Sequence, residues 1–296
     1  IARETTVDLK RFKTLWGHEG SLAEAIDQVR EAGFSGIEAP VPEAPDDAAA
    51  FGEALSANGL LWIQEICTAG SYVPRRHATI TEHLDDFETK ILSASTTGLK
   101  PEFVNVMGGC DAWPIDDSVR FFSEAQNIAD KHNVPASFET HRGRSFFSPW
   151  NTVAILEKVP HIDVTCDFSH WAVVSERLPH IEWDCIVRTA QQARHIHSRV
   201  GYDQGPQVPH PAAPEYADAL ASHQACWEAV WESQIARGLE VTTMTPEFGT
   251  DGYLHLLPFT KAPIADLWSL NRWIGEEELA HFQRWQSAAT KTSKIA

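Results

Sequence analysis

The stretch SLAEAIDQVREAGFSGIEAP, residues 21–40, predicts one helix followed by one strand. Ser21 is a suitable helix N-cap, and Glu24, three positions later, would complete a capping box. Gly33 is typical of a helix end, and the segment SGIEAP, residues 35–40, is typical of a short buried strand. Because the same order of helix and strand recurs along the whole chain, this unit decides the fold.

The eight predicted strands lie at residues 11–17, 35–40, 60–66, 102–109, 134–140, 161–167, 193–198 and 239–247. Helical patterns separate them, and strands that alternate with helices pair in parallel through right-handed crossovers. Eight such units in 296 residues predict a single (β/α)8 TIM barrel, one domain over residues 1–296, with its active site at the carboxyl ends of the strands. A doubly wound sheet would need a glycine fingerprint after the first strand, and WGHEGS does not match one.

The composition narrows the classes of partner. The chain has 41 acidic and 24 basic residues, a net charge of −17, which argues against a nucleic acid or an anionic membrane as partner. Its five cysteines form no CxxC pair, so we expect neither a disulfide framework nor a structural zinc site, and we expect a cytoplasmic location. No apolar run is long enough to predict a membrane span. The opening residues IARETTVDLK leave open whether a targeting segment has been lost.

Four consecutive predicted strands end in a side chain that can bind a metal ion: Glu139, Asp167, His197 and Glu247. In a barrel these positions share one mouth, where three carboxylates would repel one another and raise each other's pKa. A divalent cation relieves that repulsion. Oxygen and nitrogen ligands together suit Mn²⁺, Mg²⁺ or Co²⁺, with Zn²⁺ or Fe²⁺ as alternatives.

Each of these residues, taken singly, could have a purely structural role. A carboxylate at a strand end can also be a helix cap or part of a salt bridge, but four in successive strands favour a shared site. His195 and His197 lie two residues apart on one face of the strand, so alternation cannot separate them. We favour His197, nearer the carboxyl end, as the ligand and expect His195 to support it from deeper in the barrel.

The segments ETH (139–141), DFSH (167–170), HIHS (195–198) and PEF (246–248) resemble those of the xylose-isomerase-like TIM barrels, a family of sugar phosphate isomerases and epimerases. The resemblance covers most of the chain and implies one catalytic divalent metal, usually Mn²⁺ or Mg²⁺, on the four residues above. In the ketose 3-epimerases of this superfamily the two metal-bound glutamates, here Glu139 and Glu247, are the acid/base pair. A histidine three residues after the aspartate, here His170, contacts their substrate.

The chain departs from the ketose 3-epimerases after its seventh strand. They follow the metal histidine with a Glu-x-x-Arg-like segment, whereas this chain has HSRVGYDQGPQVPHP, residues 197–211, which leaves the substrate open. The ETH segment also resembles metal-dependent 3-dehydroshikimate dehydratases and C-glycoside-cleaving barrels. In those enzymes a histidine two residues after the metal glutamate is the general base, which corresponds to His141.

Such a site permits proton transfer next to a carbonyl. A metal ion stabilises an enediolate when the adjacent carbon loses its proton, and Glu139, Glu247 or His141 could accept that proton. Return of the proton to the other face gives epimerisation, and its return to the neighbouring carbon gives aldose–ketose isomerisation. Loss of a β-hydroxyl or glycosyl oxygen gives dehydration or lyase chemistry. We expect a sugar or keto-sugar isomerase or epimerase, with a metal-dependent dehydratase or lyase as the alternative.

Five further residues are candidates for substrate binding. Arg142 and Arg199 could hold a carboxylate, phosphate or polyol through a planar fork, or could pair with neighbouring acids. His18 and Trp16 follow the first strand and could wall the pocket, although Trp16 could equally be core. Glu65, near the end of the third strand, could bind a hydroxyl or cap a helix.

Two other functions fit the same fold. A DNA-repair endonuclease of the endonuclease IV type would need more histidines on strands two to four and a basic face, which the sequence lacks; a non-catalytic sugar-binding barrel would lack the complete ligand set. Trp227 and Trp231, four residues apart on one predicted helix, suggest either a buried stripe or an interface. We expect a homodimer or homotetramer.

Overall fold

The computed structural model describes residues 7–293 and shows a closed barrel of eight parallel strands in sequence order. The strands are β1 (Asp8–Thr14), β2 (Gly36–Ala39), β3 (Leu61–Cys67), β4 (Phe103–Met107), β5 (Ala136–Glu139), β6 (Asp163–Cys166), β7 (Ala193–His197) and β8 (Val241–Thr245). Pairing of β1 with both β2 and β8 closes the barrel. The predicted (β/α)8 fold is therefore confirmed.

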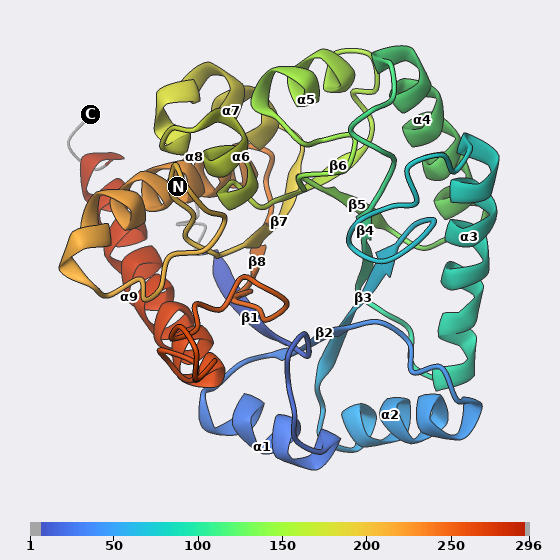
Figure 1. Cartoon of the computed structure of the whole chain (residues 1–296), viewed down its shortest axis with the longest axis horizontal. Coiled ribbons are helices and arrows are strands. Elements are labelled where there is room, and N and C mark those ends of the chain that lie inside the picture. The colour runs from blue at the N-terminus through green and yellow to red at the C-terminus, as the bar shows by residue number, and fades with distance from the viewer. Residues whose placement is uncertain (1–6, 294–296) are drawn as a thin grey trace.

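The helices form a ring outside the strands, as Figure 1 shows. They are α1 (Leu22–Glu31), α2 (Pro45–Ala57), α3 (Ile80–Ser93), α4 (Ile115–Lys131), α5 (Pro149–Leu156), α6 (Ser169–Ser175), α7 (Trp183–Ala190), α8 (Ala217–Ala236) and α9 (Leu267–Ser293). Three short 3₁₀ helices, η1 (Ala94–Thr97), η2 (Pro179–Glu182) and η3 (Pro214–Tyr216), lie in the connections. Within the part of the chain that the structure describes, no helix is long and apolar enough to cross a membrane.

Local sequence signals predicted the start of the first helix correctly and the bounds of the first strand less closely. Both halves of the capping box between Ser21 and Glu24 are present at the start of α1, as predicted. The first strand was predicted at residues 11–17, which is wrong by three residues because β1 ends at Thr14. The chain turns after Thr14, and Gly17 adopts a φ of 76°, a left-handed conformation that suits glycine.

The tryptophan stripe of α8 belongs to the core. Trp227 and Trp231 are almost fully buried, and the ring of Trp231 packs against Phe282 and Trp285 of α9. The stripe therefore joins two helices of one chain. Homo-oligomer formation stays a prediction, and this stripe no longer supports it.

Helix α9 also buries a carboxyl group. The Nε2 of Gln224 donates to Glu278 Oε1 at 2.8 Å, while Glu278 Oε2 has no hydrogen-bond partner among the described residues. Burial raises the pKa of Glu278 to about 8 from its usual 4.5. Glu278 is thus protonated in the folded protein at neutral pH.

We expect Glu278→Gln to stabilise the protein at high pH. The raised pKa means that the folded state holds a proton that the unfolded state releases above pH 4.5, so stability is lost as pH rises towards 8. Glutamine keeps the contact with Gln224 and removes this loss, which is on the order of 4 kcal/mol at pH 8. Thermal melting should show a Tm higher by several degrees at pH 8 and no gain at pH 4.5. An equal gain at both pH values would contradict the titration of Glu278 as the cause.

Candidate metal centre

The four predicted ligands converge at the carboxyl ends of their strands. Glu139 ends β5, Asp167 follows β6, His197 ends β7 and Glu247 lies two residues beyond β8. One ligand atom from each lies within 4.8 Å of the others, and all four side chains are buried. The structure therefore brings together the three acids and the imidazole as expected, and their binding of a metal ion stays a prediction.

The orientation of His197 fits a bound cation. Its Nε2–H donates to Glu38 Oε1 at 3.0 Å, so its other nitrogen, Nδ1, is the one that faces the ligand carboxylates. This Nδ1 is buried and makes no hydrogen bond within the described residues, although it lies 3.0 Å from Glu247 Oε2 and 3.7 Å from Glu139 Oε1. So close to carboxylate oxygens, Nδ1 needs a positive charge beside it, which is a second proton on the ring when no metal ion is bound, or a cation in that proton's place. The donor set of three carboxylates and one imidazole therefore fits a divalent ion.

The electrostatics of the acids support the same conclusion. Burial, together with Glu247 and Asp167, raises the pKa of Glu139 well above its usual value despite the nearby His197. Burial and Glu247 likewise raise the pKa of Asp167, although Arg199 opposes the shift. Burial lowers the pKa of His197, but the surrounding carboxylates outweigh burial and raise it overall. Without a metal ion, the cluster therefore favours extra positive charge.

Glu38, at the end of β2, accepts a hydrogen bond from His197 and so fixes the orientation of its ring. Besides the His197 imidazole, its carboxylate accepts from Asn105 Nδ2 at 3.0 Å and from the Thr245 hydroxyl. Asn105 Nδ2 also donates to Glu139 Oε2 at 2.9 Å, so Asn105 connects Glu38 to a predicted ligand. Burial would raise the pKa of Glu38, but His197 and His195 outweigh it and lower the pKa. Glu38 is therefore an ionised acceptor.

His195 lies deeper, as expected. Its Nδ1 is 2.7 Å from the Thr243 hydroxyl and its Nε2 is 3.0 Å from the Thr245 hydroxyl. Sequence reasoning placed neither Glu38 nor Asn105 in the site. The strand-end rule could have found Glu38, whereas Asn105 lies in the middle of β4.

We expect Glu38→Gln to weaken metal binding about 10- to 100-fold, as changes to groups that orient a metal ligand do. The glutamine NH₂ cannot accept, so one of the three donors around Glu38 loses its partner and His197 loses its fixed orientation. A competition assay with a chelator would measure the affinity, with circular dichroism to check the fold. Glu102→Gln, an exposed change at the opposite end of the barrel, is the control. Equal affinities in Glu38→Gln and wild type would show that Glu38 does not support the ligand.

Arg199 is tied to the ligand carboxylates. Its guanidinium forms an ion pair with Asp167, lies 3.3 Å from Glu247 Oε2 and donates to the Ser169 hydroxyl. It also approaches His170 Nε2 at 2.6 Å. These contacts agree with the alternative that Arg199 pairs with neighbouring acids. They orient the carboxylates of Asp167 and Glu247.

His141 faces the same cluster from the β5 loop. One ligand atom from each of Glu139, His141 and His170 lies within 4.8 Å of the others, and the two imidazole rings are 4.0 Å apart. The Nδ1–H of His141 donates to the backbone oxygen of Arg142, so its Nε2 is free to accept a proton. Burial, with Arg199 and Arg144, lowers the pKa of His141 well below its usual value, so the ring is neutral. His141 thus has the form that a general base requires.

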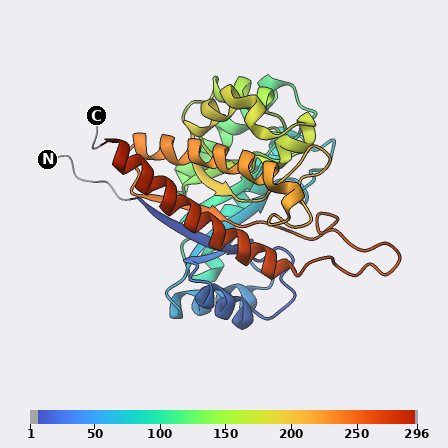
Figure 2. The same cartoon turned by 90° about the vertical axis from the view of Figure 1, so that its left-hand side faces the viewer.

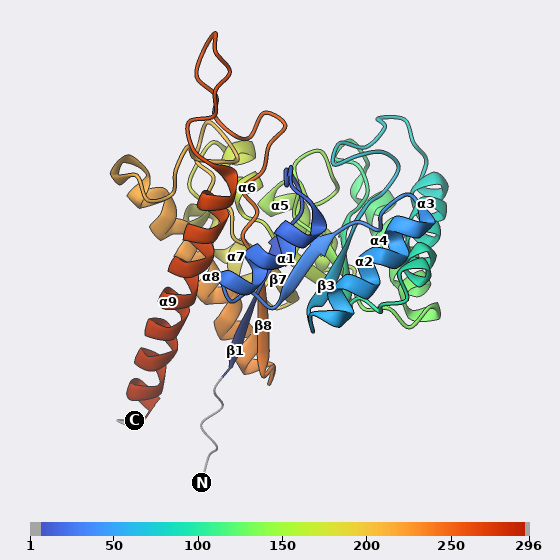
Figure 3. The same ribbon diagram turned by 90° about the horizontal axis from the view of Figure 1, so that it is seen from below.

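An aromatic wall covers the centre. Tyr253, which sequence reasoning missed, is buried in the long β8–α9 connection that projects from the barrel in Figures 2 and 3. Its ring packs 5.0 Å from that of Trp16, and the guanidinium groups of Arg142 and Arg199 each lie 4.9 Å from it. Trp16 also donates to Asp251 at 3.0 Å. Trp16 and Arg142 therefore pack against Tyr253, and their contact with a substrate stays a prediction. No local pattern in the sequence distinguishes Tyr253.

Glu65 lies near the carboxylate cluster, whereas His18 lies outside the barrel wall. Glu65 is half-buried near the carboxylates of Glu247 and Glu38. Burial and these two carboxylates raise the pKa of Glu65 to about 8, so Glu65 is protonated at neutral pH. His18 approaches the backbone oxygen of Ser21 at 3.0 Å and lines a different cavity, outside the barrel wall.

Comparison with known proteins agrees with this architecture. A family model described as xylose isomerase-like TIM barrel matches residues 26–201, which is more than half of the chain. No curated protein sequence matches the chain significantly.

Solved structures with the same fold include an L-ribulose 3-epimerase, with a TM-score of 0.65, 12% identity and coverage of 96% of this chain and 97% of that one. The probable 3-DHS dehydratase AsbF from Bacillus anthracis has a TM-score of 0.54 and 13% identity, over 82% of this chain and 93% of that one. The IOLI protein with a bound zinc atom has a TM-score of 0.58 and 14% identity, over 83% and 91%. At these identities the likeness shows the fold.

Proposed function

Because this chain belongs to the xylose isomerase-like TIM barrel family, we propose that it is a metal-dependent isomerase or epimerase of a sugar or keto-sugar. Its metal ligands are Glu139, Asp167, His197 and Glu247. The observation that carries the proposal is the buried Nδ1 of His197, which faces two carboxylates and makes no hydrogen bond within the described residues.

A bound Mn²⁺ or Mg²⁺ would withdraw electron density from a substrate carbonyl and acidify the neighbouring C–H group. The oxygen-rich donor set suits these ions, and Zn²⁺ or Fe²⁺ would also accept it. The zinc atom named for the IOLI structure supports a metal site in this fold.

The chain's own residues would move the proton. Glu247 is 6% exposed, compared with 2% for Glu139 and 0% for Asp167, so Glu247 is the ligand most open to a substrate. Glu139 is held by Asn105 Nδ2 and lies beside both His141 and Glu247, within reach of a substrate bound at the metal ion. We assign Glu247 and Glu139 as the acid/base pair. Tyr253 and Trp16 would exclude water above them.

The alternative is a dehydratase or lyase, which one observation favours. His141 is neutral, has a free Nε2 and lies beside Glu139. A base in this position could remove a proton while a β-hydroxyl or glycosyl oxygen leaves. The endonuclease alternative gains no support, because Glu38, Asn105 and Glu65 occupy β2, β4 and β3 where such an enzyme would need additional histidines.

Incubation in D₂O with Mn²⁺ and a panel of ketoses, keto-glycosides and 3-dehydroshikimate tests the proposal. Deuterium uptake at carbon without loss of water would indicate an isomerase or epimerase, and an enone product would indicate the lyase. Turnover that is unchanged after chelation of the metal would contradict both versions.

A further inference from the structure

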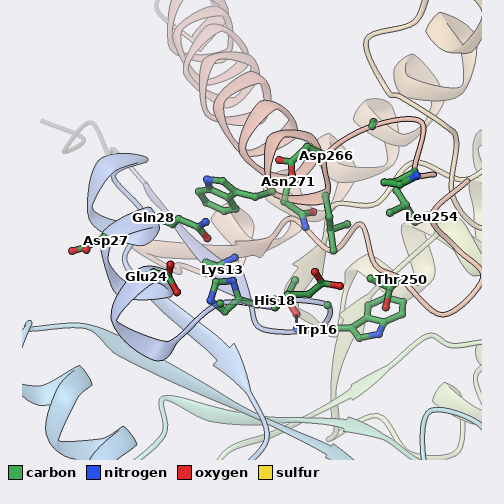
Figure 4. A pocket seen from close by; sticks show the side chains of 18 of the residues that line it. Lys13, Trp16, His18, Glu24, Asp27, Gln28, Thr250, Leu254, Asp266 and Asn271 are labelled. Carbon is green, nitrogen blue, oxygen red and sulfur yellow. Dashed lines mark hydrogen bonds between the residues drawn. The ribbon is translucent and has the colours of Figure 1, made fainter. Parts of the chain in front are cut away.

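A second cavity, of about 470 Å³, lies outside the barrel between α1 and the start of α9 (Figure 4). Residues of β1, the β1–α1 loop, α1, the β8–α9 connection and α9 line it, and none of them belongs to the carboxylate cluster. Trp16 separates the two sites, because it lines this cavity and packs against Tyr253 on the other side. The volume is in the range of small-molecule sites.

Lys13 points into this cavity from β1. The preceding residue, Phe12, packs against the ring of His195 inside the barrel, so alternation turns Lys13 outward. Lys13 is only 5% exposed, and its ammonium lies 4.3 Å from the centre of the Trp268 ring. The side chain of Lys13 makes no hydrogen bond or ion pair within residues 7–293. The surroundings of Lys13 disfavour its charged form: burial lowers its pKa to about 8, although the carboxylate of Asp266 opposes the shift.

Gln28 of α1 contributes a side-chain oxygen that accepts no hydrogen bond from the described residues. Its Oε1 is buried and has no hydrogen-bond partner among the described residues, and Figure 4 shows Gln28 and Lys13 around the same space. Asn271, also in the lining, is already paired because it accepts from the Phe248 N–H and donates to the Phe248 oxygen. The cavity thus offers one unused donor and one unused acceptor beside an aromatic ring.

The charges around the cavity argue against an anionic ligand. Five exposed carboxylates line it: Glu19, Glu24, Asp27, Glu31 and Asp266. They would repel an anion. A hydroxyl group can both accept from Lys13 and donate to Gln28, and sugar C–H groups pack well against an aromatic ring.

We propose that this cavity binds a neutral polyhydroxylated molecule of about monosaccharide size, a sugar or a cyclitol, between Lys13 and Gln28. The inference does not depend on the reaction at the metal centre. The ligand has two sources to distinguish: a second ring of an extended substrate that reaches past Trp16, or an independent sugar molecule.

Calorimetric titration of the metal-loaded protein with D-glucose, myo-inositol, cellobiose and D-glucuronate tests this proposal. At least one neutral compound should bind, and Lys13→Met should raise its Kd at least tenfold without changing the metal content. Gln28→Met should weaken the same binding, which keeps the test valid if one variant folds poorly. Lys100→Met, an exposed change at the opposite end of the barrel, should bind like wild type.

Repeating the titration after chelation separates the two sites, because binding in the cavity should persist when the metal is removed. A higher KM for disaccharide-like substrates in Lys13→Met would identify a second substrate ring, whereas unchanged KM values would identify an independent sugar. Persistent sugar binding in a protein without turnover would contradict only the proposed function. Absence of neutral-sugar binding, equal binding by Lys13→Met, or tighter binding of glucuronate would overturn the cavity proposal.

Discussion

Glu247→Gln is expected to lower kcat by about 10³-fold or more, since it removes a ligand and a proton acceptor together. The amide keeps the shape of the side chain but coordinates metal weakly and cannot take a proton from carbon. It also leaves Arg199 Nη1, 3.3 Å from Glu247 Oε2, without this carboxylate. Steady-state kinetics on the substrate identified in D₂O, with metal analysis of the purified variant, would measure both effects.

Glu139→Gln should behave alike, and the metal content should fall in at least one of the two variants. Asn105 Nδ2, which now donates to Glu139 Oε2, would face an amide that can present a donor instead. Glu240→Gln, an exposed change before β8 at the far end of the barrel, is the matched control. Full activity in both Glu247→Gln and Glu139→Gln would show that the site is assigned wrongly.

The second large effect is expected for His141→Asn. If His141 is the base, kcat should fall about 10²- to 10⁴-fold while the metal content stays at the wild-type level. Asparagine can keep the hydrogen bond to the Arg142 backbone oxygen, but it has no basic nitrogen in place of Nε2. Metal analysis and kcat measured side by side separate a lost base from a lost ligand.

His161→Asn, at an exposed position before β6, controls for the loss of an imidazole elsewhere. An unchanged rate in His141→Asn would move the base to Glu247 and favour the epimerase over the lyase. Loss of metal from His141→Asn would instead mean that this imidazole belongs to the ligand set.

Much of the site was predictable because strand ends in a barrel share one mouth. Glu139, Asp167 and His197 could be assigned from their places after buried apolar runs, and the structure brings them together. Asn105 could not be found in this way, since a polar side chain in mid-strand looks like any other interior position. Tyr253 lies in a long connection without periodicity, so its place over the centre depends on how that loop folds back.

The sequence by itself determined the number and order of the strands and their alternation with helices, because capping boxes, glycine stops and apolar runs act over a few neighbouring residues. It also determined which carboxylates could meet. Only the tertiary structure decided which nitrogen of His197 faces them, that Arg199 pairs with Asp167, and that Lys13 lies beside Trp268 in a second cavity. These contacts join residues far apart in the chain, and rotamers, hydrogen bonds and burial at such contacts depend on the complete packing of the barrel.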